Sequence, residues 1–221
     1  ADSKLRKTET IINPLGEDTS VMRTTIIPSM LEILSKNYNN RNSEAKLFEL
    51  GKEYLSTEAD KLPEEPLRLA IGMYGGNIDF YDIKGVADAL LKTVRIYDCD
   101  YVRTSDSDAF DEASAFHPGR SAVILKDGKA IGILGEIHPD VAENYGIEVK
   151  VYAAKLNVPE MLKLSEREVT YKPMPKFPAT TRDLSLICDD NLPAASIEKA
   201  IKKAAGKVLE KVTLFDVYKG K

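Results

Sequence analysis

One stretch decides the fold: Leu47-Phe48-Glu49-Leu50-Gly51-Lys52-Glu53-Tyr54-Leu55. It lies between an Asn-rich stretch, 37–40, and a loop, 62–66, in which two prolines and paired acids prevent a helix or strand from continuing. The apolar residues between these two breaks predict a buried strand over residues 45–55. At its end this strand carries the acidic Glu53 and the uncharged Leu55, so it offers no cation there.

Strand and helix patterns alternate on both sides of this stretch. Pro28 predicts the start of a helix that the Asn-rich stretch ends, because proline is preset for the first helical turn. Asp82 is the expected N-cap of a second helix, and Asp127-Gly128 between two apolar runs predicts a β-hairpin. Together these patterns predict an α+β fold with a largely antiparallel sheet and packing helices. The further elements expected are a β-branched run over 8–12, strands over 67–74, 121–125, 131–137 and 151–158, a polar loop over 104–111, and short helices over 139–145 and 159–164.

The C-terminal part of the sequence predicts a separate, smaller domain. Pro173, Pro175 and Pro178 with interleaved lysines are typical of a stiff linker. Beyond them, a strand over 182–188, a helix over 196–207 and a strand over 209–217 make one half of a ferredoxin-like βαββαβ sandwich. We therefore expect a module over 1–165, a linker over 166–178 and a truncated ferredoxin-like domain over 179–221. The absence of an initiator Met fits a fragment of a longer chain.

Composition excludes several classes of protein. The chain has 221 residues, a net charge of −4 and two cysteines. No apolar run reaches the roughly 18–20 residues of a membrane span, and no signal peptide opens the chain, so we expect a cytoplasmic protein without a membrane partner. Cys99 and Cys188 with His117 and His138 match no zinc spacing, and no metal site is expected. Residues 166–221 hold 11 basic and 8 acidic residues, so the tail is the basic part of an acidic chain.

Several motifs, in order along the chain, carry a family resemblance. The chain resembles the C-terminal part of the β subunit of bacterial-type phenylalanyl-tRNA synthetases, with a class II synthetase-like module followed by the first part of the anticodon-binding domain. The matching motifs include Ser20-Val21-Met22-Arg23-Thr24, Leu47-Phe48-Glu49-Leu50-Gly51, His117-Pro118-Gly119-Arg120-Ser121-Ala122, Gly132-Ile133-Leu134-Gly135-Glu136-Ile137-His138-Pro139, Lys176-Phe177-Pro178 and Arg182-Asp183-Leu184.

The resemblance implies that this module does not catalyse the reaction. In the family's catalytic subunit, a strand ending Gly-Arg-x-Tyr-Arg offers its last arginine to the ATP α-phosphate, where a fixed cation stabilises the transition state. The comparable stretch here is Gly51-Lys52-Glu53-Tyr54-Leu55. The family's later Gly-x-Gly-x-x-Arg motif also lacks its arginine, because Gly132-Ile133-Leu134-Gly135 is followed by Glu136. We therefore expect no catalytic residue and no bound cofactor in this chain, with ATP and magnesium used by the whole complex.

The resemblance also implies two partners, a catalytic α subunit in an α2β2 complex and tRNA(Phe). Met22, Arg23 and Thr24 are the candidate contacts with the α subunit, but Arg23 equally fits an arginine that ties a strand end to a nearby carboxylate. The candidate tRNA-binding residues are Lys176, Arg182, Lys199 and Lys203, interleaved with aromatics.

A purely structural role is an alternative for each set of candidate contact residues. The lysines also fit the solvated face of an amphipathic helix, with Phe177 and Phe215 in a core. The incomplete tail is expected to leave apolar surface uncovered, and we expect the chain to self-associate through it.

Two other functions stay open. The chain could be a stand-alone RNA-binding or regulatory paralogue that uses the same fold. It could also be a small-molecule enzyme that uses His117 with an acid such as Asp111. Against that enzyme, His117 and Arg120 lie beside Pro118-Gly119, where a role in stabilising a turn is the simpler interpretation. His138, directly before Pro139, is most simply a residue that enters a helix.

Overall fold

The computed structural model describes residues 4–57, 61–166, 168, 171, 173–174 and 176–218. The chain separates into two compact units, Ala1–Val169 and Thr170–Lys221, and each is described by itself. Pro175 of the predicted linker lies outside the described residues. In the described part of the chain, no helix combines the length and the apolar character needed to cross a membrane.

The first unit is built on an antiparallel sheet. Its six strands among the described residues lie in the order β1-β2-β6-β5-β4-β3, and every neighbouring pair is antiparallel. This arrangement confirms the predicted α+β class with an antiparallel sheet. The strands are β1 (Ala45–Lys52), β2 (Leu67–Tyr74), β3 (Asp100–Arg103), β4 (Phe116–Lys126), β5 (Lys129–Ile137) and β6 (Val151–Asn157). The four-residue β3 was not predicted.

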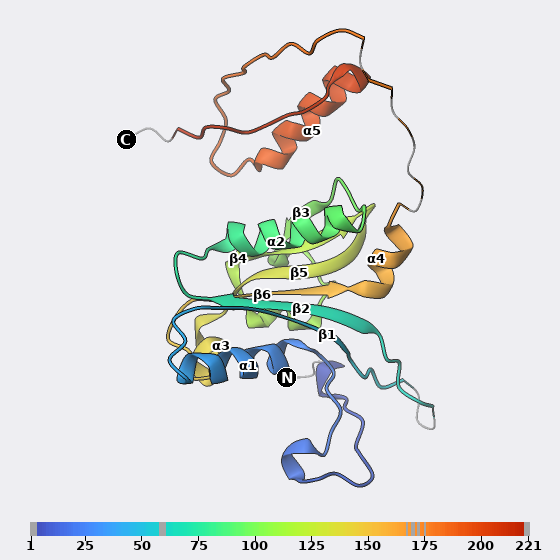
Figure 1. Cartoon of the computed structure of the whole chain (residues 1–221), viewed down its shortest axis with the longest axis vertical. Coiled ribbons are helices and arrows are strands. Elements are labelled where there is room, and N and C mark those ends of the chain that lie inside the picture. The colour runs from blue at the N-terminus through green and yellow to red at the C-terminus, as the bar shows by residue number, and fades with distance from the viewer. Residues whose placement is uncertain are drawn as a thin grey trace. The chain divides into compact units, whose positions relative to one another are not determined.

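Helices cover both faces of this sheet, as Figure 1 shows. One face carries α1 (Ile27–Asn39) and α3 (Pro139–Asn144), and the other carries α2 (Phe80–Thr93) and α4 (Val158–Leu164). A separate apolar cluster lies under each pair of helices, since alternate side chains of a strand point to opposite faces. Short 3-10 turns complete the unit: η1 (Lys4–Arg6), η2 (Glu17–Thr19), η3 (Thr104–Asp106) and η4 (Asp111–Ala115).

Local signals explain where the helices and the hairpin begin. Pro28 lies in the first turn of α1, as predicted. The N-cap of α2 is Asp79 and not Asp82: the Asp79 carboxylate accepts hydrogen bonds from the amides of Tyr81 and Asp82, and Asp82 accepts one from the amide of Asp79. Asp82 is thus the third residue of a capping box, a place an acid fills as readily as the cap itself. The predicted hairpin is confirmed, with positive φ at Asp127 and Gly128.

The predicted buried strand is wrong in one respect, because β1 is an edge strand. It pairs with β2 on one side only among the described residues, and α1 covers one of its faces. The side chains on its other face are open, so that Phe48 is 77% and Leu50 58% exposed. Hydrophobic residues in a strand therefore predicted the strand but not its place in the sheet.

Residues 8–22 form a projection, here called the arm, at the bottom of Figure 1. The β-branched run over 8–12 contributes only one isolated bridge, between Thr10 and Val21. The ladder ends there because Asn13 and Pro14 turn the chain, and proline has no amide to donate. The polar loop predicted over 104–111 begins with η3 and is joined to β4, since the buried Thr104 hydroxyl hydrogen-bonds the Ser121 hydroxyl at 2.7 Å.

The second unit contains α5 (Ala194–Ala205) followed by η5 (Gly206–Val208). The predicted helix is therefore present, two residues earlier than expected. The strands predicted over 182–188 and 209–217 are not formed among the described residues of this unit. A strand requires a hydrogen-bonded neighbour, and these two segments are not neighbours in the ferredoxin-like order, so neither can complete the other.

Candidate functional site

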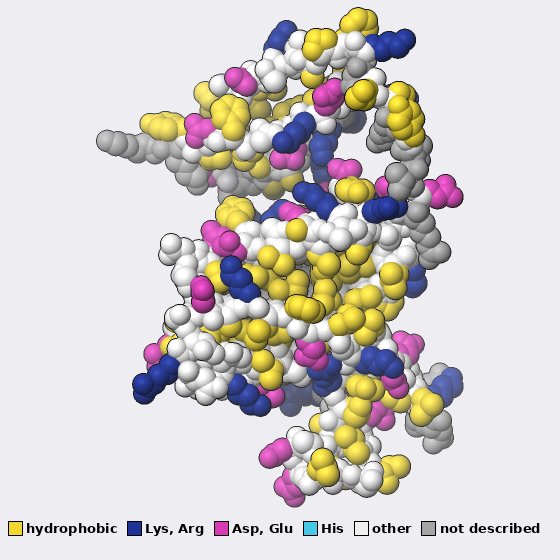
Figure 2. Space-filling view, viewed as in Figure 1, with side chains coloured by type: hydrophobic (Ala, Val, Ile, Leu, Met, Phe, Trp, Pro, Cys, Tyr) yellow, Lys and Arg dark blue, Asp and Glu magenta, His cyan; other side chains and the backbone are white. Residues whose placement is uncertain are grey.

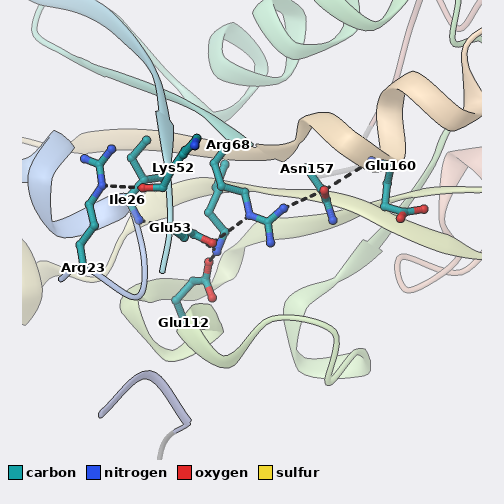
Figure 3. A network of polar contacts seen from close by, with 9 residues as sticks. Arg23, Ile26, Lys52, Glu53, Arg68, Glu112, Asn157 and Glu160 are labelled. Carbon is teal, nitrogen blue, oxygen red and sulfur yellow. Dashed lines mark hydrogen bonds and ion pairs between the residues drawn. The ribbon is translucent and has the colours of Figure 1, made fainter. Parts of the chain in front are cut away.

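The end of β1 carries a buried ion network in place of an exposed cation (Figure 3). Glu53 follows the strand directly and is buried. One carboxylate oxygen, Oε1, accepts hydrogen bonds from the Ile26 amide at 3.0 Å and from Lys155 Nζ at 3.1 Å. The other, Oε2, accepts one from Arg68 Nε at 2.8 Å. Both oxygens of Glu53 are thus held inside the protein.

The network extends across three strands. Lys155, on β6, makes a second ion pair with Glu112 of η4. Arg68, on β2, also donates to Asn157 Oδ1 at 2.7 Å, and Asn157 in turn caps the N-terminus of α4. These contacts tie β1, β2 and β6 to η4 and α4 through charged side chains (Figure 3).

The charges of the network are balanced. It contains two carboxylates, Glu53 and Glu112, and two cations, Arg68 and Lys155, all largely removed from solvent. Buried charges persist in proteins when they are paired and hydrogen-bonded. Since Arg68 and Lys155 already have carboxylate partners, neither presents an uncompensated charge to an anionic ligand.

Sequence reasoning missed this network, although a signal for it exists. Glu53 was interpreted only as a charge of the wrong sign for a phosphate site. Lys155 was not singled out, yet it interrupts the otherwise apolar run from Val151 to Leu156. A lysine in a strand that is buried on both faces requires an acidic partner, and Glu53 was the acid at a strand end.

Arg23 contacts β1 and the residues that follow it. Its guanidinium makes an ion pair with Glu49 at 2.7 Å and donates to the Lys52 carbonyl at 2.9 Å, while its own carbonyl accepts from the Tyr54 amide. The structure therefore shows the carboxylate contact that was one of the two interpretations of Arg23. Thr24 is buried and donates to the Leu5 carbonyl at 2.6 Å. Met22 is the last residue of the arm, and Arg23 and Thr24 follow it where the arm joins the rest of the unit.

The residues that align with the family's nucleotide-binding motifs take part in strand pairing and close packing in this structure. Leu55 exchanges two backbone hydrogen bonds with Glu64, at 2.9 and 3.0 Å. Gly132 lies against Leu156, whose Cδ2 would be 2.5 Å from an added Cβ. Gly135 has φ +151° and lies equally close to the backbone of β4. Both glycines allow β5 to pack closely against its neighbours.

His117 and Arg120 lie in β4, at a register shift between Phe116 and Ser121, and not in a free turn. His117 Nδ1 accepts from the Gly119 amide at 3.0 Å, which is the local stabilising role expected of it. Arg120 makes an ion pair with the buried Glu136 at 2.8 Å. Asp111 is exposed, and no contact in the described part of the chain joins it to His117. The structure does not assemble the His117–Asp111 pair.

His138 enters a helix, as predicted. Its Nδ1 accepts from the Asp140 amide at 3.3 Å at the N-terminus of α3, and its ring stacks on His117 with 6.4 Å between ring centres. Within the described residues, no group of three or more His, Cys, Asp or Glu side chains is placed to hold a metal ion.

Burial and the neighbouring Glu136 carboxylate raise the pKa of Tyr152 from 10.0 to about 12. Between these two values the unfolded chain loses the phenol proton and the folded chain keeps it, so stability falls as pH rises through this window. Phenylalanine has no proton to lose, so the free energy of unfolding of the Tyr152→Phe variant should fall less than that of the parent between pH 9 and 12. We expect the two falls to differ by up to about 2 kcal/mol. Urea denaturation at each pH measures this difference, and equal pH slopes for the two proteins would contradict it.

The four candidate tRNA-binding residues are all exposed and lie in the second unit. Lys199 and Lys203 are on α5, on the side away from the half-buried Ile197 and Ile201. Lys176 and Arg182 precede the helix, Lys176 at a bend and Arg182 in a segment without regular secondary structure. The interpretation of Phe177 and Phe215 as core residues is wrong, because both side chains are exposed. No apolar element among the described residues of this unit covers them.

Comparison with known proteins gives two family matches. Residues 1–158 match the model "Phenylalanyl tRNA synthetase beta chain CLM domain", and residues 175–221 match "Ferredoxin-fold anticodon binding domain". The "Phenylalanine--tRNA ligase beta subunit" of Clostridium tetani is 47% identical over 99% of this chain, and that of Clostridium acetobutylicum is 44% identical over 100%. The chain spans 27% of the length of each of these relatives.

Solved structures support the fold alone. A pyrrolysyl-tRNA synthetase from Desulfitobacterium hafniense superposes with a TM-score of 0.56 and 12% identity, over 77% of this chain and 61% of that one. A second structure, of the same organism's PylSc, gives a TM-score of 0.55 with 12% identity, over 73% of this chain and 53% of that one. The first unit's antiparallel sheet with helices on both faces is therefore a fold that this chain shares with these two structures.

Proposed function

Because the chain belongs to the phenylalanyl-tRNA synthetase beta-chain family, we propose that it is a non-catalytic part of a phenylalanine–tRNA ligase β subunit. In this proposal the first unit is a scaffold that contacts the catalytic α subunit of an α2β2 complex. The second unit contributes to binding the anticodon of tRNA(Phe). The complex would act in the cytoplasm, where it supplies phenylalanyl-tRNA for protein synthesis.

The observation that carries the non-catalytic role is the closed ion network around Glu53. Adenylate formation builds negative charge on phosphorus, and a free, fixed cation lowers its barrier. At the end of β1 the chain places Leu55 and the carboxylate of Glu53. The nearby cations Arg68 and Lys155 are neutralised by carboxylates. ATP and magnesium would accordingly be bound by the α subunit and used by the whole complex.

Charge and exposed aromatic rings support the tRNA-binding role of the second unit. Single-stranded bases stack on aromatic side chains, while lysines and arginines hold the phosphates. Phe177, Phe215 and Tyr218 are exposed in this unit, together with the cations Lys199 and Lys203. The same unit also exposes apolar side chains, which supports the expected self-association when no partner covers them: Leu184, Leu186, Ile187, Leu214 and Val217.

Co-purification with the α subunit tests the scaffold role. The complete β subunit and its α subunit are co-expressed with an affinity tag on the β chain only. We expect the α chain to be recovered in a 1:1 ratio and the purified complex to aminoacylate tRNA(Phe). Recovery of the β chain alone, with salt-dependent tRNA binding, would favour the RNA-binding paralogue. Micromolar binding of ATP by the β chain alone would favour a separate enzyme.

Charge reversal on α5 tests the anticodon-binding role. We expect the Lys199→Glu/Lys203→Glu variant of the complex to bind tRNA(Phe) about 10-fold or more weakly, with a salt dependence reduced by about one or two ion equivalents. The measurement is tRNA binding by fluorescence anisotropy at several salt concentrations. Lys92→Glu/Lys129→Glu in the first unit is the control, expected to bind as the parent does. Equal losses in both variants would mean that bulk charge, and not α5, sets the affinity.

A further inference from the structure

The first unit contains a cavity of about 330 Å³ that the proposed function does not use. It lies where η3, η4, the first residues of β4 and the entry to α3 meet. Its apolar lining consists of Ala113, Phe116 and Pro118. Its polar lining consists of Thr104, Ser105, Ser114 and His138. A cavity of this size, with apolar walls and a few polar groups, is typical of a site for a small molecule.

His138 brings an unused hydrogen-bond donor to this lining. Its Nδ1 accepts from the Asp140 amide at 3.3 Å, so the neutral ring carries its proton on Nε2. Nothing in the described part of the chain accepts a hydrogen bond from this Nε2–H. The ring also stacks on His117, with 26° between the two ring planes, which restricts its rotation.

The hydroxyl of Ser114 is the second unused group. The Thr104 hydroxyl is already paired with Ser121 Oγ at 2.7 Å, and the Ser105 hydroxyl donates to Asp106 Oδ1 at 2.8 Å. The Ser114 hydroxyl has no hydrogen-bond partner among the residues that the structure describes. A hydroxyl and an imidazole N–H can both donate, so a ligand that satisfies both groups brings an acceptor.

The charges around the cavity favour an uncharged acceptor. No lysine, arginine, aspartate or glutamate belongs to the lining. The acids nearest to it are Asp106, which bonds to Ser105, and Asp140, whose carboxylate is 3.7 Å from His138 Nδ1. An anionic ligand would meet these acids without a cation to pair with it. An ammonium group would bring donors where the lining needs an acceptor.

We propose that this cavity binds a small, uncharged molecule with a carbonyl oxygen and a compact apolar body. The carbonyl oxygen accepts hydrogen bonds from His138 Nε2 and Ser114 Oγ, and the apolar body packs against Phe116 and Ala113. The inference goes beyond the proposed function and does not depend on it, because all of these residues belong to the first unit and no partner is required.

The test titrates the 221-residue chain with benzamide and follows the imidazole nitrogens by long-range proton–nitrogen NMR correlation. The chain has two histidines, so a variant that lacks one of them assigns both sets of signals. We expect both rings to show the Nε2–H tautomer before benzamide is added. Benzamide is expected to shift the His138 nitrogens more than those of His117, with a dissociation constant of about 1 mM.

Two probes of nearly the same shape test the charge of the ligand. Benzoate keeps the ring and the carbonyl carbon of benzamide but is an anion, and benzylammonium is a cation without a carbonyl oxygen. Each is expected to bind about 10-fold or more weakly than benzamide, in the same titration.

Three variants locate the probe in the cavity. His138→Asn keeps an N-cap acceptor for the Asp140 amide but removes the ring N–H, and Ser114→Ala removes the hydroxyl. Each is expected to weaken benzamide binding about 5-fold, followed through the backbone amide signals of residues 113–117. Ala113→Leu fills part of the cavity and is expected to abolish binding. An unchanged melting temperature shows that each variant is folded.

A fourth variant controls for binding to open apolar surface. Figure 2 shows hydrophobic side chains gathered over the middle of the first unit, where Figure 1 draws the sheet. Phe48 on β1 is an exposed aromatic side chain outside the cavity. Phe48→Asp is expected to bind benzamide as the parent does.

Each contrary result overturns the proposal in its own way. Unchanged His138 signals at saturating benzamide would show that the cavity takes no such ligand. Benzoate binding as tightly as benzamide would show a site for anions and not for uncharged carbonyl compounds. Weaker binding by Phe48→Asp, with none of the three cavity variants affected, would place the probe on the surface of β1.

Discussion

Replacing Lys155 with methionine is expected to lower the free energy of unfolding by about 3–5 kcal/mol. The substitution keeps the volume of the side chain but removes the cation that lies between Glu53 and Glu112. Glu53 retains Arg68, whereas Glu112 loses its ion pair while its side chain stays buried. A buried carboxylate without a partner is among the costliest single changes in a protein interior. Urea denaturation followed by circular dichroism measures the difference.

Two further variants show whether the charge, and not the shape, is responsible. Lys150→Met removes an exposed lysine just before β6 and is expected to change stability by less than about 0.5 kcal/mol. Lys155→Met/Glu112→Gln removes the stranded charge and is expected to recover part of the lost stability. A loss below about 1 kcal/mol for Lys155→Met would mean that the network is open to water, and the account of a closed site would be wrong.

The second large effect is expected at Gly135, where alanine should lower the free energy of unfolding by about 2–4 kcal/mol. Gly135 has φ +151°, and an added Cβ would lie 2.5 Å from the Arg120 carbonyl oxygen and from the Ser121 Cα. These neighbours are backbone atoms of β4 and cannot rotate away. Thermal or urea unfolding measures the loss, with Gly85→Ala as the control. Gly85 lies inside α2 in open space, where alanine is expected to raise stability by about 0.5–1 kcal/mol.

This experiment also separates a structural glycine from a ligand-binding one. Gly135 belongs to the stretch Gly132-Ile133-Leu134-Gly135, which was compared above with the family's nucleotide-binding Gly-x-Gly-x-x-Arg motif. If Gly135 served a nucleotide, alanine would lower the affinity for ATP while leaving the fold intact. We expect the opposite, a less stable sheet and no change in nucleotide binding. A stable Gly135→Ala variant would contradict the structural role.

The sequence predicted the elements that depend on short-range chemistry. Pro28 marked the start of α1, and Asp127-Gly128 marked the hairpin between β4 and β5. The antiparallel α+β class followed from these elements. Short-range reasoning erred where two residues compete for one role: Asp79 and Asp82 both fit an N-cap, and only the geometry shows that Asp79 takes it.

What could not be predicted depends on residues far apart in the chain. Glu53 and Lys155 are 102 positions apart, so their contact follows from the order β1-β2-β6 and from no local pattern. The exposure of Phe48 likewise depends on which strand pairs with β1 and on which face of β1 a helix covers. In the second unit, a segment such as 182–188 needs a hydrogen-bonded neighbour before it becomes a strand. Pairing partners, and not propensity, decided each of these cases.

Calorimetric titration of the complete β subunit with ATP and magnesium shows whether the end of β1 can hold a nucleotide. We predict no saturable binding to the β subunit alone up to millimolar ATP, because the cations beside Glu53 are already neutralised. The α2β2 complex is expected to bind ATP under the same conditions. Saturable micromolar binding by the β subunit alone, lost in an Arg68→Leu variant that still folds, would show that Arg68 is free to hold a phosphate and would contradict the closed network.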